Sequence, residues 1–553
     1  MAEVTELLGA IVTEALDRAK ADGLLEGEVP EPTFERPRRK DHGDWATNVA
    51  LVASAGGNPR SLAEAIVERL PASDIVRSVE VAGPGFLNFH LSPRWLHDIV
   101  TRAATEGSGF GRSNIGNGEK VNVEYVSANP TGPVNVVSGR QAAVGDAISS
   151  LLEATGHEVT REFYVNDAGR QIELFGESVG ARYLQLHGQD AAIPEEGYQG
   201  EYLVDLVKEL SDGLGDELLN APADERNKKL GRIALDTMLA QMSATLERFG
   251  TTFDVWFSER TLHEAGEVEA ALEALRATGR VYENDGAVWF RSSDLGDDKD
   301  RVLVRSDGTP TYLSADAAYV LDKFGRGFER LLYLWGPDHH GSIVRFLAAV
   351  ESLGLERDRV EVSIVQVVSL MRGGEAVKSS KRAGSIVPLE QLIDDVGPDA
   401  ARYIFLQRSM EAPLDFDLDL AREQAPENPV FYVQYAHARI CSILRKAADE
   451  GVAAVDATSA PLERLEHGSE DDLMRALATY EDVIPEAAYK RAPQRVTNYI
   501  EELASTFSSF YRDCKVVTED ADLTAARLAL CVATKNVIAD ALSLLGVSAP
   551  ERM

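Results

Sequence analysis

The sequence predicts a multidomain α/β plus α protein: an N-terminal α+β domain over residues 1–108, a Rossmann-like parallel-sheet domain over 109–387 and a C-terminal all-α domain over 388–553. The 553 residues are several times the length of an average domain. Strand and helix patterns alternate in the middle of the chain, which is typical of a parallel sheet. After about Pro388 the strand patterns vanish, so we expect only helices from there to the C-terminus.

The first domain combines helical and strand patterns. Residues 1–20 place apolar side chains at helix spacing, and a second helix is expected from about Ser61 to Leu70. Between them lies a short apolar run from Ala46 to Val52. A strand pattern over Val79–Leu91 is interrupted by Gly83-Pro84-Gly85, which indicates a turn.

The second domain opens with a βαβ pattern after a glycine- and serine-rich stretch at 106–118. A strand at Lys120–Val126 is followed by a loop at Ser127–Pro133, a helix from about Arg140 to Ala154 and a strand at Val159–Val165. Such a unit predicts two parallel strands joined by a right-handed crossover. Further expected elements are strands at 331–334 and 362–368 and a largely helical, acidic insertion at about 170–300.

The composition argues against several classes of protein. Lys and Arg number 56 and Asp and Glu 90, so the net charge is −34. This disfavours a general nucleic-acid coat, since such binding depends on cations, and an RNA partner would be contacted only locally. The three cysteines form no C-x-x-C pair, and neither a signal peptide nor an apolar run of about 18 residues is present. We therefore expect a cytoplasmic protein with no protein-held metal and no membrane association.

The loop after the first strand of the βαβ unit is rich in hydrogen-bond donors. It lies at the carboxyl end of a strand and leads into a helix N-terminus, where phosphate groups bind well. An ordinary turn built from ordinary turn residues is the alternative. The density of donors favours a phosphate site, and the donors are Ser127, Asn129, Thr131, Asn135 and Ser138.

Two acids point to a cationic ligand. Glu124 lies inside a predicted strand, and a buried carboxylate is costly unless it is paired, so it either pairs with a structural arginine or holds a cation. Tyr312 and Asp316 are four residues apart on a predicted helix and share a face. A carboxylate with an aromatic ring suits a planar guanidinium, although a Tyr–Asp surface pair is the simpler alternative.

Two further segments suggest nucleotide chemistry. Asp338, His339 and His340 follow the predicted strand at 331–334 and could bind a ribose, a base or an amino group; the alternative is a set of turn residues beside the packed Trp335. Adjacent histidines seldom ligate one metal ion. The basic segment Lys378–Arg382, flanked by glycines, suits a transferring triphosphate, and a solvated basic loop is its alternative.

Together and in this order, these segments resemble the arginyl-tRNA synthetases, which are class I aminoacyl-tRNA synthetases. Ser127–Pro133 resembles the first signature region, and Lys378–Arg382 resembles the K-M-S-K-S loop with Ser379 at the methionine position. Two segments, Asp41–Asp44 and Ala82–Asn88, are similar to the N-terminal domain that touches the outer corner of the tRNA. Two more, Pro398–Arg402 and Asn428–Lys446, resemble the helical anticodon-binding domain.

The resemblance implies a role for each matching residue. The expected arginine contacts are Glu124, Asn129, Tyr312, Asp316 and Asp338. The expected ATP contacts are Ser127, Thr131, Gly132, Pro133, Asn135, Ser138, His339, His340, Lys378, Ser380 and Lys381. The expected catalytic residues are Asn135, Ser138, Lys378 and Lys381. The expected tRNA contacts are Phe86, Asn88, Tyr435 and Arg439.

The resemblance also implies the reaction. Arginine would be activated by ATP with Mg²⁺ and then transferred to the 3′-terminal adenosine of its tRNA by a cytoplasmic monomer. The two acids disfavour a synthetase for an apolar or acidic amino acid.

One motif departs from the family, which usually shows H-x-G-H where this chain has Asn135-Val-Val-Ser138. Either Asn135, Ser138 and the basic loop replace the histidines, or the chain is a degenerate RNA-binding paralogue. We favour an active enzyme, because the arginine contacts, the basic loop and both tRNA-binding domains are all retained.

Overall fold

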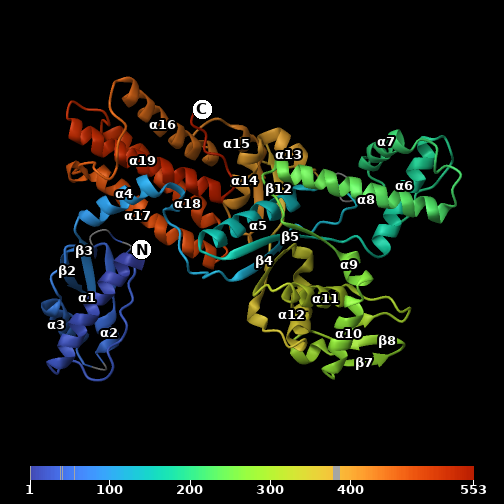
Figure 1. The fold of residues 1–553 in the computed structure, drawn as a ribbon, viewed down its shortest axis with the longest axis horizontal. Helices are drawn as coiled ribbons and strands as arrows, with labels where there is room; N and C mark the ends of the chain where they lie inside the picture. Colours follow the sequence, from blue (N-terminus) through green and yellow to red (C-terminus); the bar gives the residue numbers. More distant parts are fainter. Residues whose placement is uncertain (1, 38, 40–41, 55–56, 378–386) are drawn as a thin grey trace. The chain divides into compact units, whose positions relative to one another are not determined.

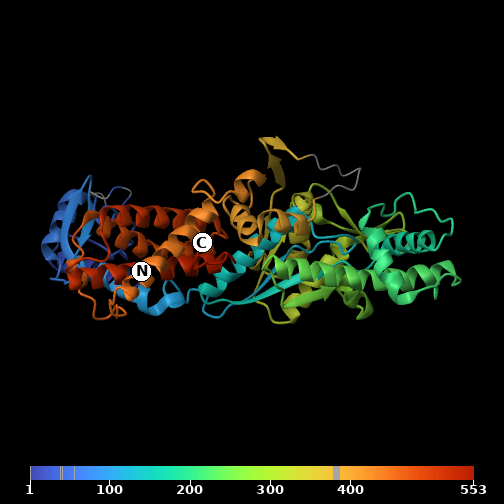
Figure 2. The ribbon, with the colours of Figure 1, turned by 90° about the horizontal axis from the view of Figure 1, so that it is seen from above.

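The computed structural model describes residues 2–37, 39, 42–54, 57–377 and 387–553. The chain divides into two units, which Figure 1 and Figure 2 trace by sequence colour. One unit comprises residues 1–111, 440–482 and 505–537. The other comprises residues 112–439, 483–504 and 538–553 and carries most of the predicted site. No helix in the described ranges is long and apolar enough to cross a membrane.

The first unit begins with the predicted α+β domain. Its three-stranded antiparallel sheet has the order β1-β3-β2, and the expected strand over Val79–Leu91 is a hairpin with its turn at Gly83–Gly85. The apolar run at Ala46–Val52 divides into a strand and a short helix. The elements are α1 (Ala2–Ala21), β1 (Trp45–Thr47), α2 (Val49–Ala53), α3 (Pro59–Arg69), β2 (Val76–Ala82), β3 (Phe86–Leu91) and α4 (Arg94–Glu106).

The second unit contains the predicted parallel sheet. Five strands have the order β11-β10-β4-β5-β6, and every neighbouring pair is parallel. The β4–α5–β5 unit is confirmed, whereas the strand expected at 362–368 is two strands, β11 and β12. The elements are β4 (Lys120–Tyr125), α5 (Val136–Ala154), β5 (Glu158–Val165), β6 (Val255–Ser258), β10 (Arg330–Trp335), β11 (Val360–Ile364) and β12 (Val368–Arg372).

The expected helical insertion at about 170–300 is only partly helical. Helices α6 (Arg170–Leu186), α7 (Tyr202–Leu214) and α8 (Ala223–Arg248) form a cluster with its own apolar core (Figure 1). The chain then returns to the sheet as β6 and adds a separate antiparallel sheet. These strands have four residues each, too short for their periodicity to be told from that of a helix. They follow α9 (Glu259–Glu264) and α10 (Glu267–Ala277) and are β7 (Val281–Asn284), β8 (Ala287–Phe290) and β9 (Arg301–Val304).

The expectation of helices alone after Pro388 is wrong at one place. Strand β14 (Leu414–Asp417) pairs in parallel with β12, which also pairs with β13 (Glu375–Ala376). Its Leu and Phe are buried and its two acids exposed, the alternation of a half-buried strand, but over only four residues. The helices of this region are α13 (Leu389–Val396), α14 (Pro398–Leu406), α15 (Leu418–Arg422), α16 (Pro429–Asp449), α17 (Gly468–Tyr489), α18 (Gln494–Asp513) and α19 (Ala521–Leu544).

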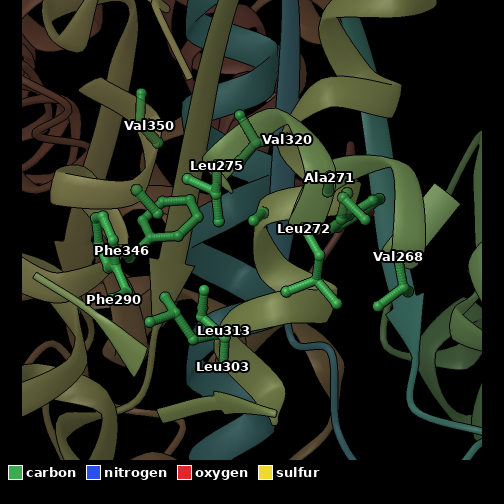
Figure 3. Close-up of a cluster of buried hydrophobic side chains, with 14 of the residues drawn as sticks. Val268, Ala271, Leu272, Leu275, Phe290, Leu303, Leu313, Val320, Phe346 and Val350 are labelled. Atoms are coloured by element: carbon green, nitrogen blue, oxygen red, sulfur yellow. The ribbon is translucent and has the colours of Figure 1, made fainter. Parts of the chain in front are cut away.

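An apolar cluster fixes the helix that carries Tyr312 and Asp316. That helix, α11 (Tyr312–Gly325), contributes Leu313 and Val320 to the cluster, where they meet Leu275 of α10 and Phe346 of α12 (Ile343–Ser352) (Figure 3). All four apolar side chains are buried. The cluster therefore holds the polar side of α11 in one orientation.

Replacing Gly145 with alanine should destabilise the second unit. A Cβ built at Gly145 of α5 lies 2.2 Å from the ring of Tyr125, which is fully buried with its ring centroid 4.6 Å from that of Phe253. Overpacking costs about 1–3 kcal/mol, and denaturant unfolding should show that loss. Gly213→Ala in α7 is the matched control, because nothing lies within 4 Å of its Cβ position. Equal unfolding free energies for the two variants would contradict the close packing.

Candidate active site

Glu124 lies inside strand β4 and is paired with a lysine rather than an arginine. Its side chain is 7 % exposed, and its Oε2 accepts a hydrogen bond from Lys323 Nζ at 2.7 Å. The Oε1 atom accepts from the hydroxyl of Ser127 at 3.1 Å. From the sequence, we expect Glu124 to pair with a structural arginine or to hold a cationic ligand. In the structure its partner is instead a lysine of α11.

A second buried acid, which the sequence analysis missed, lies on the neighbouring strand. Glu162 of β5 is fully buried and accepts two hydrogen bonds from the guanidinium of Arg326, at 2.6 and 2.8 Å. Asn122 and the hydroxyl of Tyr319 also donate to it. Glu162 is thus fully satisfied within the protein. Its position inside a predicted strand was the same signal that drew attention to Glu124.

Among the described residues Asp316 has no such partner, and the pKa of its carboxyl group is shifted. Burial and the nearby charges of Glu124 and Glu259 raise the pKa of Asp316 to about 7, while Arg345 and Lys323 oppose this shift. Tyr312, the first residue of α11, lies one turn earlier and is 61 % exposed. The two side chains therefore share a helix face as predicted, and the ring is accessible to a ligand.

Glu259, the first residue of α9, completes what we call the acidic cluster: Glu124, Glu259 and Asp316. Burial raises the pKa of Glu259, and hydrogen bonds with Tyr164 and His263 oppose that shift. Its Oε2 is buried without a hydrogen-bond partner among the described residues. The sequence analysis missed Glu259, because it assigned this region to a helical insertion.

The loop after β4 is held in an unusual backbone conformation. Val126 and Ser127 have φ angles of 69° and 39°, values that are rare for non-glycine residues and mark a constrained strand end. The turn lets the Ser127 hydroxyl donate to Glu124 while accepting from the backbone N–H of Tyr164 at 3.2 Å. Further along, the carbonyl of Thr131 accepts from the hydroxyl of Tyr202, a residue of α7.

Helix α5 begins at Val136 and not at Arg140 as expected. Asn135 is its N-cap, and the Asn135 Oδ1 atom accepts from the backbone N–H of Ser138 at 2.9 Å. The residues that replace H-x-G-H are therefore the cap and first turn of the helix. The amide nitrogen of Asn135 and the Ser138 hydroxyl have no hydrogen bond among the described residues that would occupy them.

The basic segment lies outside the described residues, so the positions of Lys378, Ser380 and Lys381 are not part of this structure. The residues that follow it are ordered against the first signature. The Val136 N–H donates to the Val387 carbonyl at 3.2 Å, and the Leu389 N–H donates to the Val134 carbonyl at 2.8 Å. The stretch Val387–Leu389, which follows the basic segment in sequence, is thus joined by backbone pairing to the residues on either side of Asn135.

The remaining predicted substrate contacts lie at the carboxyl side of the strands. Asp338, His339 and His340 are exposed on the short 3₁₀ helix after β10, with His339 Nε2 3.5 Å from Asp338 Oδ2. Asn129 is exposed, and its amide donates to Gln171 at 3.1 Å. Gly132 and Pro133 lie in the same loop as Asn129 and precede the cap of α5.

The predicted tRNA contacts fall in both units. Phe86 and Asn88 lie on β3, where Asn88 is buried opposite Ala46. On α16 the Arg439 guanidinium lies 4.5 Å from the centroid of the Tyr435 ring and donates to its hydroxyl at 2.6 Å. Tyr435 is 41 % exposed and stacks on Phe431, with ring centroids 5.9 Å apart. An exposed ring beside an arginine is suited to stacking on a nucleotide base.

Three family models match the chain in order. Residues 6–91 match the arginyl tRNA synthetase N-terminal domain, 100–415 the class I (R) tRNA synthetase catalytic domain and 433–553 the DALR anticodon-binding domain. The chain belongs to the arginyl-tRNA synthetase family. It is an ATP-dependent aminoacyl-tRNA synthetase of class I, as the sequence indicated.

Curated relatives match this synthetase over its whole length. The arginine–tRNA ligase of Moorella thermoacetica is 48% identical over 556 residues, with 100% of this chain and 99% of that protein covered. The arginine–tRNA ligase of Desulforamulus reducens is 45% identical over 558 residues, with 100% and 98% covered.

Solved structures share the fold. The arginyl-tRNA synthetase of Thermus thermophilus matches with a TM-score of 0.76 at 22% identity, covering 99% of this chain and 100% of that one. That of Plasmodium falciparum matches with a TM-score of 0.74 at 16% identity, covering 100% and 99%. At these identities the likeness concerns the fold alone, and it agrees with the predicted architecture.

Proposed function

We propose that the acidic cluster of this synthetase, which attaches arginine to its tRNA, binds the guanidinium of the substrate. The single observation that carries the assignment is Asp316, a largely desolvated carboxylate that two other acids destabilise and that no cation among the described residues contacts directly. A ligand that brings a planar cation would relieve this repulsion. Asp316 and Glu124 would take the two edges of the guanidinium, and the exposed Tyr312 ring would cover its face.

The remaining proposed contacts of arginine and ATP lie at the same carboxyl edge of the sheet. Asn129 and Asp338 are exposed and would meet the amino acid's polar groups, and the exposed His339 and His340 would meet the adenosine. Ser127, Thr131, Gly132 and Pro133 form the loop that leads to α5. The phosphates would lie at the N-terminus of α5, where the Asn135 amide and the Ser138 hydroxyl donate and the helix dipole adds a positive potential.

The first step would be attack of the arginine carboxylate on the α-phosphorus of ATP. Binding holds the two reactants in line, and donors near the phosphates stabilise the charge that develops as pyrophosphate leaves. Lys378 and Lys381 are proposed to supply the cationic part of this stabilisation. Mg²⁺ would arrive with ATP; the described residues contain no group of three or more His, Cys, Asp or Glu side chains able to hold a metal ion.

The second step would transfer arginine to the 2′-hydroxyl of the terminal adenosine. Tyr435 and Arg439 would contact the anticodon arm, and Phe86 the outer corner of the tRNA, whereas Asn88 is buried and would act only through the strand it shares with Phe86. We also propose that the protein acts in the cytoplasm as a monomer; its three cysteines are buried, as packing residues are.

The altered first signature is compatible with catalysis. Asn is a strong N-cap residue, so the replacement keeps the helix start intact while still presenting neutral donors. The full-length relatives are ligases, which favours the active enzyme over the degenerate paralogue. Arginine-dependent and tRNA-dependent ATP–pyrophosphate exchange tests this directly. Purified protein that binds tRNA but shows no exchange with any amino acid would contradict the proposal.

The kcat/KM for arginine should fall as pH is lowered through about 7, the pKa of Asp316. A protonated Asp316 cannot pair with a guanidinium, so each pH unit below the midpoint should cost up to about tenfold. Aminoacylation at saturating ATP and tRNA over pH 5.5–9 measures this. Asp316→Asn should abolish this part of the profile and give a low kcat/KM at every pH, with little change in the KM for ATP. An acid limb that survives in Asp316→Asn would remove Asp316 from the arginine site.

Replacing Asn135 with aspartate should raise the stability of the protein but weaken its binding of ATP. A carboxylate at an N-cap keeps the cap and favours the helix dipole by about 0.3–1 kcal/mol, but it repels phosphate, so the KM for ATP should rise about tenfold or more. Asn58→Asp is the matched control, since Asn58 caps α3 in the same way through Arg60 and Ser61. It should stabilise without changing any kinetic constant. An unchanged ATP KM in Asn135→Asp would place the phosphates elsewhere.

A further inference from the structure

We propose that Lys323 is a positioning residue for the arginine substrate: a built-in cation that holds Glu124 and leaves the site with one uncompensated negative charge. The inference rests on the proposed arginine site. It assigns a role in recognition to a residue that does not itself touch the substrate in that proposal.

Lys323 is enclosed completely. Its side chain is 0 % exposed, and its Nζ lies 2.7 Å from Glu124 Oε2 and 4.0 Å from Glu162 Oε1. The same ammonium lies 4.2 Å from the ring centroid of Tyr319 and 4.1 Å from that of Tyr333. Two carboxylates and two ring faces therefore stabilise the charged form, and they oppose the lowering of its pKa that burial causes.

The charge of Lys323 is available to Glu124 because Glu162 has another partner. Arg326 donates to both oxygens of Glu162, and its Nε also donates to Asp322 at 2.7 Å, so Glu162 has a bidentate cation partner of its own. Lys323 forms its short contact with Glu124 alone. Removing one partner of a buried ion pair leaves an uncompensated buried charge. The free energy of the site therefore depends on which acid Lys323 is paired with.

Counting charges around Asp316 shows what Lys323 does for the ligand. With all three carboxyls ionised and His263, whose Nε2 lies 3.5 Å from Glu259 Oε1, neutral, the acidic cluster carries three negative charges, and Lys323 with Arg345 supplies two positive ones, which leaves a net charge of −1. One guanidinium neutralises this set. Without Lys323 the set would carry −2, and Asp316 would hold its proton to higher pH because Glu124 would repel it more strongly.

Groups from every surrounding element act on Asp316. The titratable and charged groups around it are Glu124 of β4, Tyr164 of β5, Glu259 of α9, Lys323 of α11, Tyr333 of β10 and Arg345 of α12. Lys323 is the cation among them that directly contacts an acid of the cluster. Arg345 donates to the Gly341 carbonyl at 2.9 Å and the Ser342 hydroxyl at 3.0 Å.

The test compares the pH midpoint of arginine kcat/KM among four proteins: wild type, Lys323→Met, Glu124→Gln and the double variant. Lys323→Met should move the midpoint upward by about one pH unit or more, and Glu124→Gln should move it downward. The double variant should return close to the wild-type midpoint, since it removes one charge of each sign. A merely structural role for Lys323 would lower stability but leave the midpoint of Lys323→Met at the wild-type value and that of the double variant at the value of Glu124→Gln.

Two further variants act as controls. Lys323→Arg keeps the charge and should keep the wild-type midpoint. Arg330→Gln removes an acid-paired arginine of β10 that lies against Glu119, with N–O distances of 3.1 and 3.2 Å, and is not among the groups acting on Asp316. It should leave the midpoint unchanged.

The outcomes separate the two proposals. A wild-type protein without arginine-dependent activity would overturn the arginine site itself. An active wild type whose midpoint is the same in Lys323→Met would overturn the role of Lys323 alone. If Lys323→Met does not fold, the double variant decides, because it lacks the unpaired buried carboxylate. Its midpoint should lie above that of Glu124→Gln, and equal midpoints in these two variants would overturn the role of Lys323.

Discussion

The ion pair between Lys323 and Glu124 is the interaction on which the proposed site depends. It joins α11 to the middle of the parallel sheet and lies where water cannot replace either partner. Such a pair contributes little net stability, because desolvation offsets the attraction, but it penalises every arrangement that separates the two groups. The apolar cluster that contains Leu313 and Phe346 adds hydrophobic packing, which also holds α11 in place. Together they fix Asp316 and Tyr312 relative to Glu124.

The nucleotide side of the site depends on the start of α5. Asn135 ends the loop and caps the helix, and the segment after the basic loop pairs with the backbone on both sides of it. At the cap, backbone pairing therefore joins two stretches that are about 250 residues apart in sequence, which is roughly the length of a whole parallel-sheet domain. In other members of the family a histidine is usual here. Asparagine is a strong N-cap residue and a neutral donor, so in the proposed reaction the cationic role falls to the basic segment.

The long periodic elements of the fold could be predicted from sequence. The β4–α5–β5 unit, β10 and the N-terminal helices followed from patterns longer than about five residues, where period 2 and period 3.6 differ clearly. The errors fall on short strands: β6 to β9 and β14 have four residues each, and their pairing partners decide their conformation. Within the site, Glu124 could be predicted because an acid inside a strand pattern is unusual, and Asp316 because it lies four residues after Tyr312 on a predicted helix. Glu162 carried the same signal as Glu124, but its pairing with Arg326 could not be predicted, and neither could the roles of Lys323 and Glu259, since these depend on contacts between elements distant in sequence.

The central claim is that the substrate guanidinium lies between Asp316 and Glu124 while Lys323 stays on the far side of Glu124. A crystal structure of the synthetase with L-arginine bound tests this most directly. The account predicts guanidinium nitrogens within hydrogen-bonding distance of both carboxylates and an intact Lys323–Glu124 contact. Arginine bound away from these carboxylates, or a Lys323 side chain displaced by the ligand, would contradict it.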